Sequence, residues 1–302
     1  MIPEFPNFKN IELSDEEDII KFTSQYPPYS DFNFISMWSW DIKGEMQISQ
    51  LNNNLVVRFT DYLNGEPFFS FLGNKKPVET VKKLLSICQK GGCKSELDLI
   101  PEVCVQDLIS EDALRVQDTR DHFDYIYDLT KVSEYAGGQF AQKRTRVNQF
   151  IRNYPECLIE LLDLCDREVQ LKIIELDTLW LESKIKSDPN FKVKNELLAT
   201  LRFFEGDFNN ILGTAIHHKG KLIGYSIFSI LPNSYATSHF CKANTEYNGA
   251  YDFLIRESAK ILLKKGCLHL NYEQDLGLQG LRTSKMSFTS DFLKKYIVSF
   301  PQ

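Results

Sequence analysis

The sequence lacks most of the features that would assign it to a protein class directly. Its seven cysteines are scattered, with no C-x-x-C pair and no histidine at zinc-ligand spacing from any of them. We therefore predict neither a disulfide framework nor a metal site, and interpret the cysteines as reduced thiols of a cytoplasmic protein. The longest apolar runs, FFSFL and IFSIL, are far shorter than the ~20 residues that a membrane-spanning helix needs.

Signals for export and for several common enzyme folds are also missing. The start, MIPEFPNFKNIELSDEED, becomes acidic at once and lacks the basic and apolar regions of a signal peptide. The motifs GxGxxG, GxxxxGK[ST], HExxH and GxSxG are absent, so dinucleotide-binding, P-loop, zinc-protease and hydrolase functions have no motif support. The formal net charge of −6 excludes a wholly basic nucleic-acid binder, so any anionic partner must meet a local cluster of cations.

The order of predicted elements repeats once along the chain. With 302 residues, 43% of them apolar, the chain is long enough to form two hydrophobic cores. In each half, helices precede an antiparallel hairpin, and then a strand leads into a helix and a further strand. The predicted strands are 45–50, 54–61, 67–73, 96–100 and 124–129 in the first half and 211–218, 221–231, 235–243 and 267–273 in the second; the main helices are 77–92, 168–183, 193–205, 252–265 and one starting near 276.

A strand, a helix and a second strand imply a right-handed crossover between neighbouring parallel strands. An antiparallel hairpin leading into such a unit is the plan of the GNAT acyltransferase fold. We therefore predict an α+β (mixed α/β) protein of two tandem GNAT-like domains, each a mixed sheet flanked by helices. The predicted domains are residues 1–130 and 131–302, and the second begins with a basic linker helix over 139–153.

The segment NYEQDLGLQGLRTSK, residues 271–285, gathers two carboxylates, two glycines and two cations after an apolar run. In the strand CLHLNYE, alternation places His269, Asn271 and Glu273 on one face and apolar side chains on the other. A parallel strand buried on both faces would be apolar throughout, so this polar face is either a solvent or interdomain surface or the lining of a ligand site. Asp275 is suited to cap the helix that follows.

Arg282 and Lys285 lie three residues apart in the predicted final helix and share one of its faces. One interpretation is that these long side chains extend to solvent beside an apolar stripe. The other is that they reach into a cleft toward a carboxylate or phosphate, which the planar guanidinium of Arg282 would grip with two hydrogen bonds. The sequence leaves both interpretations open.

A basic stretch, GGQFAQKRTRVNQFIRNYP, joins the two halves and contains four cations and no acid. On a helix, Arg144 would share a stripe with Val147 and Ile151, where an apolar residue is expected. Such a run is commonly a solvated face. However, an arginine within an apolar stripe needs an anionic partner, either a protein carboxylate or a bound phosphate. We therefore regard this helix, with Lys143 and Asn148 beside Arg144, as the best candidate anion site in the sequence.

The third candidate is the strand-to-helix turn within YATSHFCKANTEYNGAYDFL. In acetyltransferases of the GNAT fold, backbone amides of this turn wrap the coenzyme A pyrophosphate through a Gln/Arg-x-x-Gly-x-Gly/Ala pattern. Here Glu246, Gly249 and Tyr251 occupy the patterned positions, and the acid and the bulky ring count against coenzyme A. Lys242, near the end of the strand, is included among the candidate substrate-binding residues.

Three blocks of the sequence together resemble a known family. YSDFNFISMWSWD (29–41), DYIYDLTKVSEYAGGQFAQKRTRVNQF (124–150) and LNYEQDLGLQGLRTSKMSF (270–288) are similar to signature blocks of uncharacterised bacterial proteins related to the C-terminal domain of phosphatidylglycerol lysyltransferase. The resemblance implies tandem GNAT-like domains and, as in characterised lysyltransferases, transfer of an aminoacyl group from aminoacyl-tRNA to a lipid headgroup without coenzyme A. The membrane-embedded half of those enzymes has no counterpart in this sequence. The family elements Lys-Arg-x-x-x-Asn and Asn-x-Glu-x-Asp-x-Gly carry over to Lys143, Arg144 and Asn148 and to Asn271, Glu273, Asp275 and Gly277, with Arg282 and Lys285 following.

Three hypotheses follow for the function. The leading one is transfer of an aminoacyl or acyl group, from aminoacyl-tRNA or acyl-CoA, to an amine or hydroxyl acceptor, with Glu273 or Asp275 as the catalytic carboxylate. The second is a coenzyme-A-dependent N-acetyltransferase. The third is a non-catalytic module that binds tRNA or another polyanion through residues 143–152, and in each case we allow for peripheral contact with a membrane. The candidate substrate-binding residues are Lys143, Arg144, Asn148, Lys242, Asn271, Arg282 and Lys285.

Overall fold

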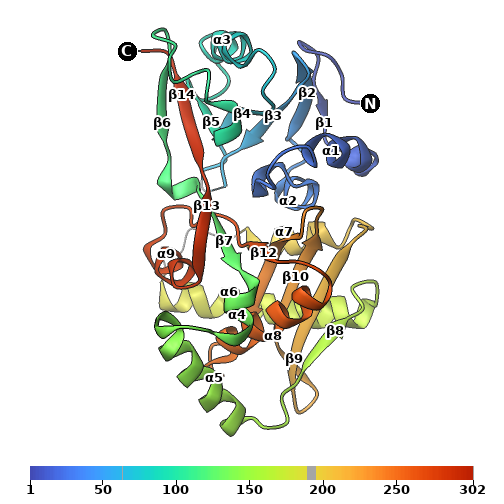
Figure 1. The fold of residues 1–302 in the computed structure, drawn as a ribbon. Helices are drawn as coiled ribbons and strands as arrows, with labels where there is room; N and C mark the ends of the chain where they lie inside the picture. The colour runs from blue at the N-terminus through green and yellow to red at the C-terminus, as the bar shows by residue number, and fades with distance from the viewer. Residues whose placement is uncertain (63, 189–194, 302) are drawn as a thin grey trace. The chain divides into compact units, whose positions relative to one another are not determined.

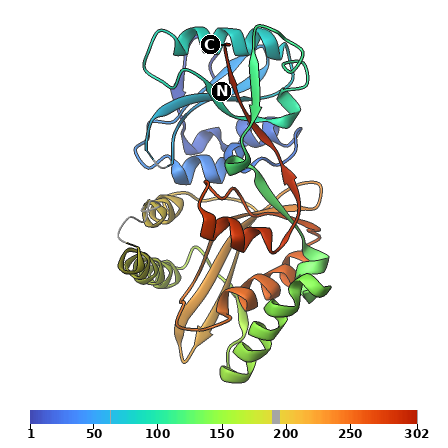
Figure 2. The same cartoon turned by 90° about the vertical axis from the view of Figure 1, so that its left-hand side faces the viewer.

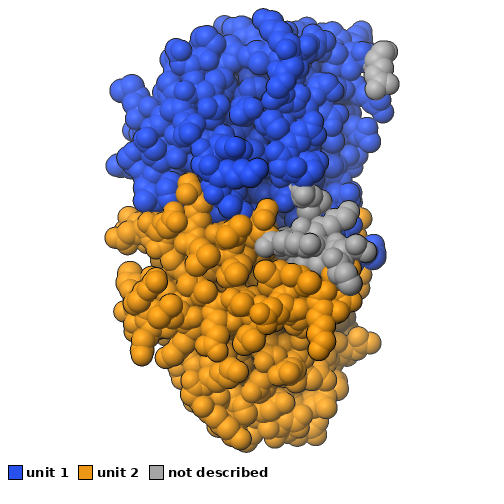
Figure 3. All heavy atoms as spheres, turned by 180° about the vertical axis from the view of Figure 1, so that it is seen from behind, with its two compact units in different colours: residues 1–124, 274–279, 292–302 blue, residues 125–273, 280–291 orange. Residues whose placement is uncertain are grey.

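The computed structural model describes residues 1–62, 64–188 and 195–301 (Figure 1). The chain divides into two compact units, coloured in Figure 3. Unit 1 contains residues 1–124, 274–279 and 292–302, and unit 2 contains residues 125–273 and 280–291. The predicted domain boundary at residue 130 lies close to the first passage of the chain from unit 1 to unit 2. Two later segments of the chain return to unit 1.

Unit 1 is built on a seven-stranded mixed sheet in the order β1-β2-β3-β4-β5-β14-β6. β2, β3 and β4 are antiparallel, whereas β4 and β5 are parallel and are connected through α3. The elements of this unit are β1 (Lys9–Asn10), α1 (Glu16–Thr23), α2 (Phe34–Trp40), β2 (Gln47–Leu51), β3 (Asn54–Thr60), β4 (Pro67–Leu72), α3 (Pro77–Cys88), β5 (Leu97–Pro101), β6 (Arg115–Asp118), β14 (Lys295–Ser299) and the short 3-10 helices η1 (Leu13–Asp15), η2 (Ser30–Phe32), η3 (Glu102–Cys104) and η4 (Arg120–His122).

Unit 2 repeats this plan with a second seven-stranded sheet, in the order β13-β7-β12-β11-β10-β9-β8. β9, β10 and β11 are antiparallel, and β11 and β12 are parallel neighbours connected through α8. The elements are β7 (Asp124–Asp128), α4 (Leu129–Glu134), η5 (Gly138–Phe140), α5 (Ala141–Asn153), β8 (Ile159–Leu162), α6 (Arg167–Ser187), α7 (Glu196–Phe203), β9 (Ile211–His218), β10 (Lys221–Ile230), β11 (Tyr235–Ala243), α8 (Ala250–Lys264), β12 (His269–Asn271), α9 (Gln279–Met286) and β13 (Thr289–Leu293).

Helices cover both faces of the second sheet. α6 and α7 pack on one face, against β10 and β11, and α8 packs on the opposite face with α5 beside it (Figure 2). α8 buries Leu254, Ile255, Ala259 and Leu262, the stripe that its sequence predicts. The core of this unit therefore lies in two layers, one on each side of the sheet.

Each sheet receives a strand from the other half of the chain. In unit 1, the C-terminal strand β14 lies between β5 and β6 and pairs antiparallel with both. In unit 2, β7, which comes from the first half of the sequence, pairs antiparallel with β12, and β13 lies on its other side. The chain passes from unit 1 to unit 2 after residue 124, and its last return to unit 1 falls within β13, after residue 291. Neither half of the chain therefore completes its sheet alone.

The predicted class of two mixed sheets flanked by helices is confirmed, and so are most of the predicted elements. Of the predicted helix 193–205, residues 193 and 194 lie outside the described residues, and α7 accounts for 196–203. The strands β1, β6, β8, β13 and β14 were not predicted from the sequence. In the parts of the chain that the structure describes, no helix combines the length and hydropathy that crossing a membrane requires.

Candidate functional site

The second sheet opens between its two parallel strands. β11 and β12 pair over three residues, from Tyr235 opposite His269 to Thr237 opposite Asn271. β12 then ends, whereas β11 continues to Ala243. Among the described residues, no strand pairs with β11 on this side beyond Thr237, so its backbone groups there need other hydrogen-bond partners.

Side chains of unit 2 itself fill these positions. The Lys285 ammonium, on α9, donates a hydrogen bond of 2.6 Å to the Tyr272 carbonyl oxygen, directly after the end of β12. On the β11 side, the Ala243 backbone amide faces the hydroxyl of Tyr251, and burial raises the pKa of that hydroxyl to about 12. The Cys241 thiol faces the hydroxyls of Ser226 and Tyr272, and burial raises its pKa too. Side chains of unit 2 therefore occupy this opening and bond to backbone groups beside it.

The turn between β11 and α8 does not fit coenzyme A, which the fold would imply. Gly249 adopts a left-handed conformation with φ of 92°, and a β-carbon there would lie 2.6 Å from the Arg146 carbonyl oxygen. The turn thus packs directly against the backbone of α5. Tyr251 is turned toward the end of β11, and Glu246 adds an exposed negative charge where a pyrophosphate would have to sit. These features remove both the space and the charge complementarity that the cofactor needs.

Two cations of the basic helix α5 share one carboxylate within unit 2. Lys143 Nζ lies 3.2 Å from Asp252 Oδ1, and Arg146 Nε donates a 2.5 Å hydrogen bond to Asp252 Oδ2. The Lys143 ammonium also lies 3.4 Å from the centroid of the Phe288 ring. Burial lowers the pKa of Lys143, although the Asp252 carboxylate acts in the opposite direction. Lys143 therefore meets a protein carboxylate, the first of the two partners that the sequence left open for this helix.

The predicted position of Arg144 in an apolar stripe was wrong. The buried side chains of α5 are Lys143, Val147 and Phe150, whereas Ile151 is 40% exposed. The stripe is shifted by one residue because both registers satisfy the helical spacing. The Arg144 guanidinium is half-buried and donates hydrogen bonds to the carbonyl oxygens of Tyr135 and Gly137, with the latter at 2.8 Å. Its partners are thus backbone carbonyls after α4, and Asn148 on the same helix is exposed.

A buried polar network lies on the α6 and α7 face of the second sheet. Asp177 accepts hydrogen bonds from the hydroxyls of Thr200, at 2.6 Å, and Tyr225, at 2.7 Å. Lys242 forms an ion pair with Glu196, and its ammonium lies 4.4 Å from the centroid of the Trp180 ring. Burial alone would lower the pKa of Lys242, but the carboxylates of Glu196 and Asp177 outweigh it and the pKa is raised. Lys242, a predicted substrate-binding residue, is therefore a positively charged member of this network.

Sequence reasoning did not single out Asp177, although a signal was present. It falls between Ile173, Leu176 and Trp180 on the stripe of α6, so an acid stands where an apolar residue is expected. Burial raises the pKa of Asp177, and the positive charge of Lys242 partly opposes that shift. A buried carboxylate of this kind needs the hydroxyl and ammonium partners that the network provides.

His239 was also not singled out. It lies on β11 beside an irregularity in the pairing with β10, between Ile227 and Phe228, and just beyond the last residue of β11 that pairs with β12. Its Nε2 is 2.9 Å from the Ser229 hydroxyl, and its side chain is buried. Burial lowers the pKa of His239 to about 3, so the imidazole is neutral at physiological pH. An isolated histidine in a strand carries no motif that would have identified it.

The segment 271–285 is divided between the two units. Asn271 is fully buried, and its side-chain oxygen accepts a 2.8 Å hydrogen bond from the Glu273 amide. Glu273 is half-buried and left-handed, with φ of 56°. Both cations of this segment belong to unit 2, where Arg282 is half-buried and Lys285 is buried.

Asp275 belongs to unit 1 and is fully buried. One of its carboxylate oxygens accepts a 2.8 Å hydrogen bond from the Gly277 amide, and the other lies 3.5 Å from Arg120 Nη1. This carboxylate therefore stabilises the turn before α9, a capping role close to the one the sequence predicts. α9 itself begins at Gln279 rather than near Leu276.

Comparison with known proteins identifies relatives along the whole chain. An uncharacterised protein of Mycoplasmoides gallisepticum is 23% identical over 181 residues, and because these are 58% of this chain and 55% of that protein, the match spans about half of the relative. The crystal structure of a conserved protein of unknown function from Bacteroides thetaiotaomicron superposes with a TM-score of 0.84 at 24% identity, covering 100% of both chains. The structure of L-PGS from Bacillus licheniformis superposes with a TM-score of 0.62 at 13% identity, over 99% of this chain and 94% of that one.

At these identities the superpositions show a shared fold. Family membership comes from a different comparison. Residues 24–299 match the family described as phosphatidylglycerol lysyltransferase, C-terminal. The match includes the three blocks that carry the resemblance in the sequence, and the chain therefore belongs to the family of the phosphatidylglycerol lysyltransferase C-terminal domain.

Proposed function

We propose that this protein transfers an aminoacyl group from an aminoacyl-tRNA to an amine or hydroxyl acceptor, without coenzyme A. Membership of the lysyltransferase C-terminal family supports the reaction class. The observation that carries the choice of donor is the filled opening between β11 and β12. Because Tyr251 and Lys285 satisfy the exposed backbone there, a donor that binds by inserting into the sheet is disfavoured.

In this proposal the reaction is attack of the acceptor on the ester carbonyl that links the amino acid to the tRNA ribose. A new amide or ester bond forms, and the bond between the carbonyl carbon and the ribose oxygen breaks. A carboxylate accepts the proton of the acceptor and returns it to the departing ribose hydroxyl. We assign this role to Glu273, because its side chain is half-buried and the polar face of β12 leads to it. Asp275 is fully buried against Arg120 and Gly277, and we assign it a structural role instead.

Two further candidate residues are suited to supporting roles. Asn271 fixes the Glu273 backbone through a 2.8 Å hydrogen bond, which limits the directions its carboxylate can take. Arg282, half-buried on α9, is the candidate for holding a donor phosphate or stabilising the oxyanion that develops on the attacked carbonyl. Lys143, Arg144, Lys242 and Lys285 are engaged with partners inside unit 2, and we assign them to the support of the fold.

The test is a transfer assay with tRNA charged with radiolabelled amino acids. Acceptors are phosphatidylglycerol vesicles and a set of small amines and alcohols. We expect labelled product with the wild-type protein, and a loss of at least 100-fold with Glu273→Gln, while tRNA binding stays within twofold. The matched control is Glu246→Gln, which removes an exposed carboxylate from the β11–α8 turn of the same unit and should leave the rate unchanged.

Two results would count against the proposal. Binding of charged tRNA without any transfer to the whole acceptor set would favour a non-catalytic RNA-binding module. Acetyl transfer from acetyl-CoA would favour the acetyltransferase alternative and would contradict our interpretation of the filled opening.

A further inference from the structure

A lysine-rich segment of unit 1 lies around α3. Residues 74–95, NKKPVETVKKLLSICQKGGCKS, contain six lysines and a single acid, Glu79. The basic stretch of residues 137–155 contains four cations and no acid. Since the whole chain carries a formal charge of −6, these two segments are the natural places for a polyanion to bind.

The cations of the two segments differ in their partners and in their exposure. In α5, Lys143 and Arg146 share the Asp252 carboxylate, and Arg144 is bound to backbone carbonyls. Around α3, by contrast, the Lys76 and Lys83 side chains are 71% and 48% exposed. Exposed ammonium groups are therefore available to a partner around α3, whereas three of the four cations of α5 already have partners within unit 2.

Two further lysines at α3 make no ion pair with any of the residues that the structure describes. These are Lys75, in the turn before the helix, and Lys90, just after it, and both side chains are exposed. Lys76 and Lys83 share Glu79, at 3.8 Å and 3.1 Å. Exposed ion pairs of this kind contribute about 0–1 kcal/mol to stability, so either lysine can exchange its contact with Glu79 for one with a phosphate at little cost.

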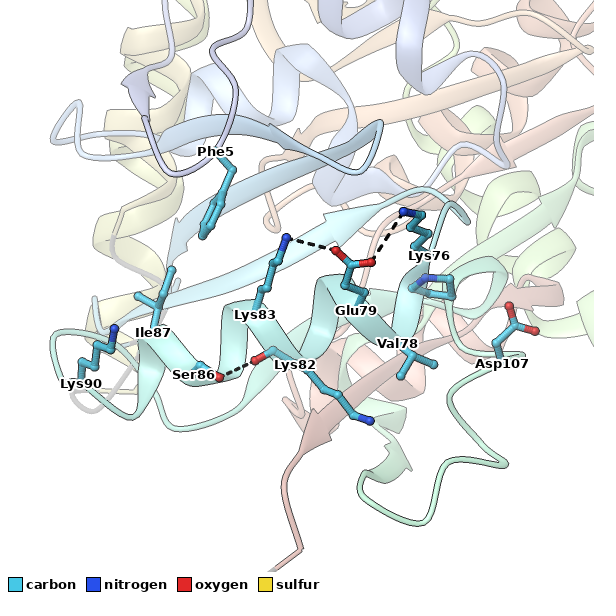
Figure 4. Close-up of a pocket in the computed structure, with 11 residues that line it drawn as sticks. Phe5, Lys76, Val78, Glu79, Lys82, Lys83, Ser86, Ile87, Lys90 and Asp107 are labelled. Atoms are coloured by element: carbon cyan, nitrogen blue, oxygen red, sulfur yellow. Dashed lines mark hydrogen bonds and ion pairs between the residues drawn. The ribbon is translucent and has the colours of Figure 1, made fainter.

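A groove of about 850 Å³ runs along this surface. Four lysines, Lys76, Lys82, Lys83 and Lys90, line it together with apolar side chains that include Phe5 and Ile87 (Figure 4). Figure 4 shows the Glu79 carboxylate between the Lys76 and Lys83 ammonium groups, with Lys90 farther along toward the other end of the helix. The surface thus combines a row of ammonium groups with a concave apolar floor.

The spacing of the row indicates what kind of anion it fits. Lys76, Lys83 and Lys90 recur every seven residues, which is about two helical turns or ~10 Å, so the row is ~20 Å long. A lysine ammonium attracts phosphate as a point charge and lacks the planar pair of donors with which arginine grips one group. Contacts of this kind suit the phosphates of a nucleic-acid backbone, which carry no sequence information. An aromatic ring beside such a row provides a stacking surface for an unpaired base.

We propose that the lysine row of α3 and its groove bind the phosphate backbone of the RNA donor. This inference rests on the proposed function, because that function supplies the RNA. The surface belongs wholly to unit 1, whereas Glu273 and Arg282, to which we assign the chemical step, belong to unit 2. It therefore contributes to donor affinity and not to the chemical step.

The test is the salt dependence of tRNA binding by the full chain, measured for the wild type and for the double variant Lys83→Gln, Lys90→Gln. Each phosphate contact that is lost lowers the slope of log K against log salt concentration by about 0.7–0.9. We expect the slope to fall by about 1.5, the KM for charged tRNA to rise about tenfold, and kcat to stay unchanged. The matched control, Lys264→Gln, Lys265→Gln, removes two exposed lysines at the end of α8 and should change neither quantity.

An unchanged slope in the Lys83, Lys90 variant, with wild-type tRNA binding and transfer intact, would overturn this inference and leave the proposed function standing. Loss of binding to anionic phosphatidylglycerol vesicles, with tRNA binding unaltered, would overturn it in favour of a lipid surface. Failure of the wild-type protein itself to bind tRNA would overturn the proposed function as well. Unfolding temperatures of both double variants within about 2 °C of the wild type would show that the fold is retained.

Discussion

Lys143 and Asp252 form a buried ion pair, with 3.2 Å between the ammonium nitrogen and the nearer carboxylate oxygen. The other oxygen of Asp252 is bound by Arg146, so one carboxylate pairs with two cations of α5. This pairing fastens α5 to the first turn of α8. Two of the four cations of α5 are therefore held by a carboxylate of the same unit.

The first prediction concerns the asymmetry of this cluster. Asp252→Asn leaves two cations without their carboxylate, and we expect it to lower the free energy of unfolding by about 3–5 kcal/mol. Lys143→Met should cost less, because Arg146 still pairs with Asp252 and the Met side chain fills the apolar space. Urea unfolding measures both, with Arg152→Gln on the exposed side of α5 as a control that should stay within about 0.5 kcal/mol. Equal losses in the two variants would contradict the shared-carboxylate arrangement.

The second prediction concerns the turn that packs against α5. Gly249→Ala forces a β-carbon to within 2.6 Å of the Arg146 carbonyl oxygen, in addition to the cost of a left-handed backbone. Gly220→Ala is the matched control, because Gly220 has φ of 78° and nothing within 4 Å of the added atom. We expect a loss of about 1 kcal/mol for Gly220→Ala from the backbone conformation, and at least ~2 kcal/mol more for Gly249→Ala. If thermal denaturation gave the two variants the same stability, the packing of this turn on α5 would be refuted.

The third prediction separates a structural from a substrate-binding role for Lys285. Its ammonium caps the Tyr272 carbonyl, and hydrogen bonds from charged groups contribute about 1.5–3 kcal/mol. Lys285→Met should lower the free energy of unfolding by roughly that amount and leave the salt dependence of tRNA binding unchanged. Chemical denaturation and binding titrations at several salt concentrations give both quantities. A normal stability with a reduced salt slope would instead show that Lys285 binds the donor.

The fourth prediction is a pH dependence that originates from His239. Because burial lowers its pKa to about 3, the folded protein does not bind a proton at this site between that pH and ~6.5, where the unfolded chain does. The contribution of His239 to the free energy of unfolding is therefore fully present above pH ~6.5 and is lost progressively as the pH falls toward 3. With 1.36 kcal/mol per pKa unit, the total is on the order of 5 kcal/mol.

The comparison variant for this effect is His239→Gln, whose pH dependence of unfolding between pH 7 and 5 should be flatter than that of the wild type. His269→Gln, at a half-buried position on β12, is the control and should keep the wild-type slope. Parallel curves for the wild type and the His239 variant would show that this imidazole titrates normally.

Periodicity was sufficient to predict the elements whose burial is one-sided. α6 and α8 follow their apolar stripes, and the hairpin of β9 and β10 follows its two runs of strand-forming residues around the turn at Lys219. These elements are local, so nearby residues decide them. The register of α5 was not decided in this way, because stripes through Arg144 and through Lys143 both fit the spacing and only the position of Asp252, more than a hundred residues away, selects Lys143.

The exchange of β7 and β14 was not predictable for a related reason. A strand pattern specifies which side chains face the core, but it does not specify which sheet the strand joins. β14, for example, pairs with β5 and β6, which lie far earlier in the chain.

Of the candidate site, the polar face of β12 was visible in the alternation of the sequence. The filling of the opening beside it by Tyr251 and Lys285 depends on contacts between distant segments.

The central claim is that the donor is an aminoacylated RNA and not coenzyme A. Thermal unfolding of the wild-type protein with acetyl-CoA, aminoacyl-tRNA or deacylated tRNA tests it most directly. A ligand at a hundredfold excess over its Kd stabilises the fold by ~2.7 kcal/mol, a readily measured shift. We predict that aminoacyl-tRNA raises the unfolding temperature and that millimolar acetyl-CoA leaves it unchanged. A saturable increase with acetyl-CoA and none with aminoacyl-tRNA would contradict the account.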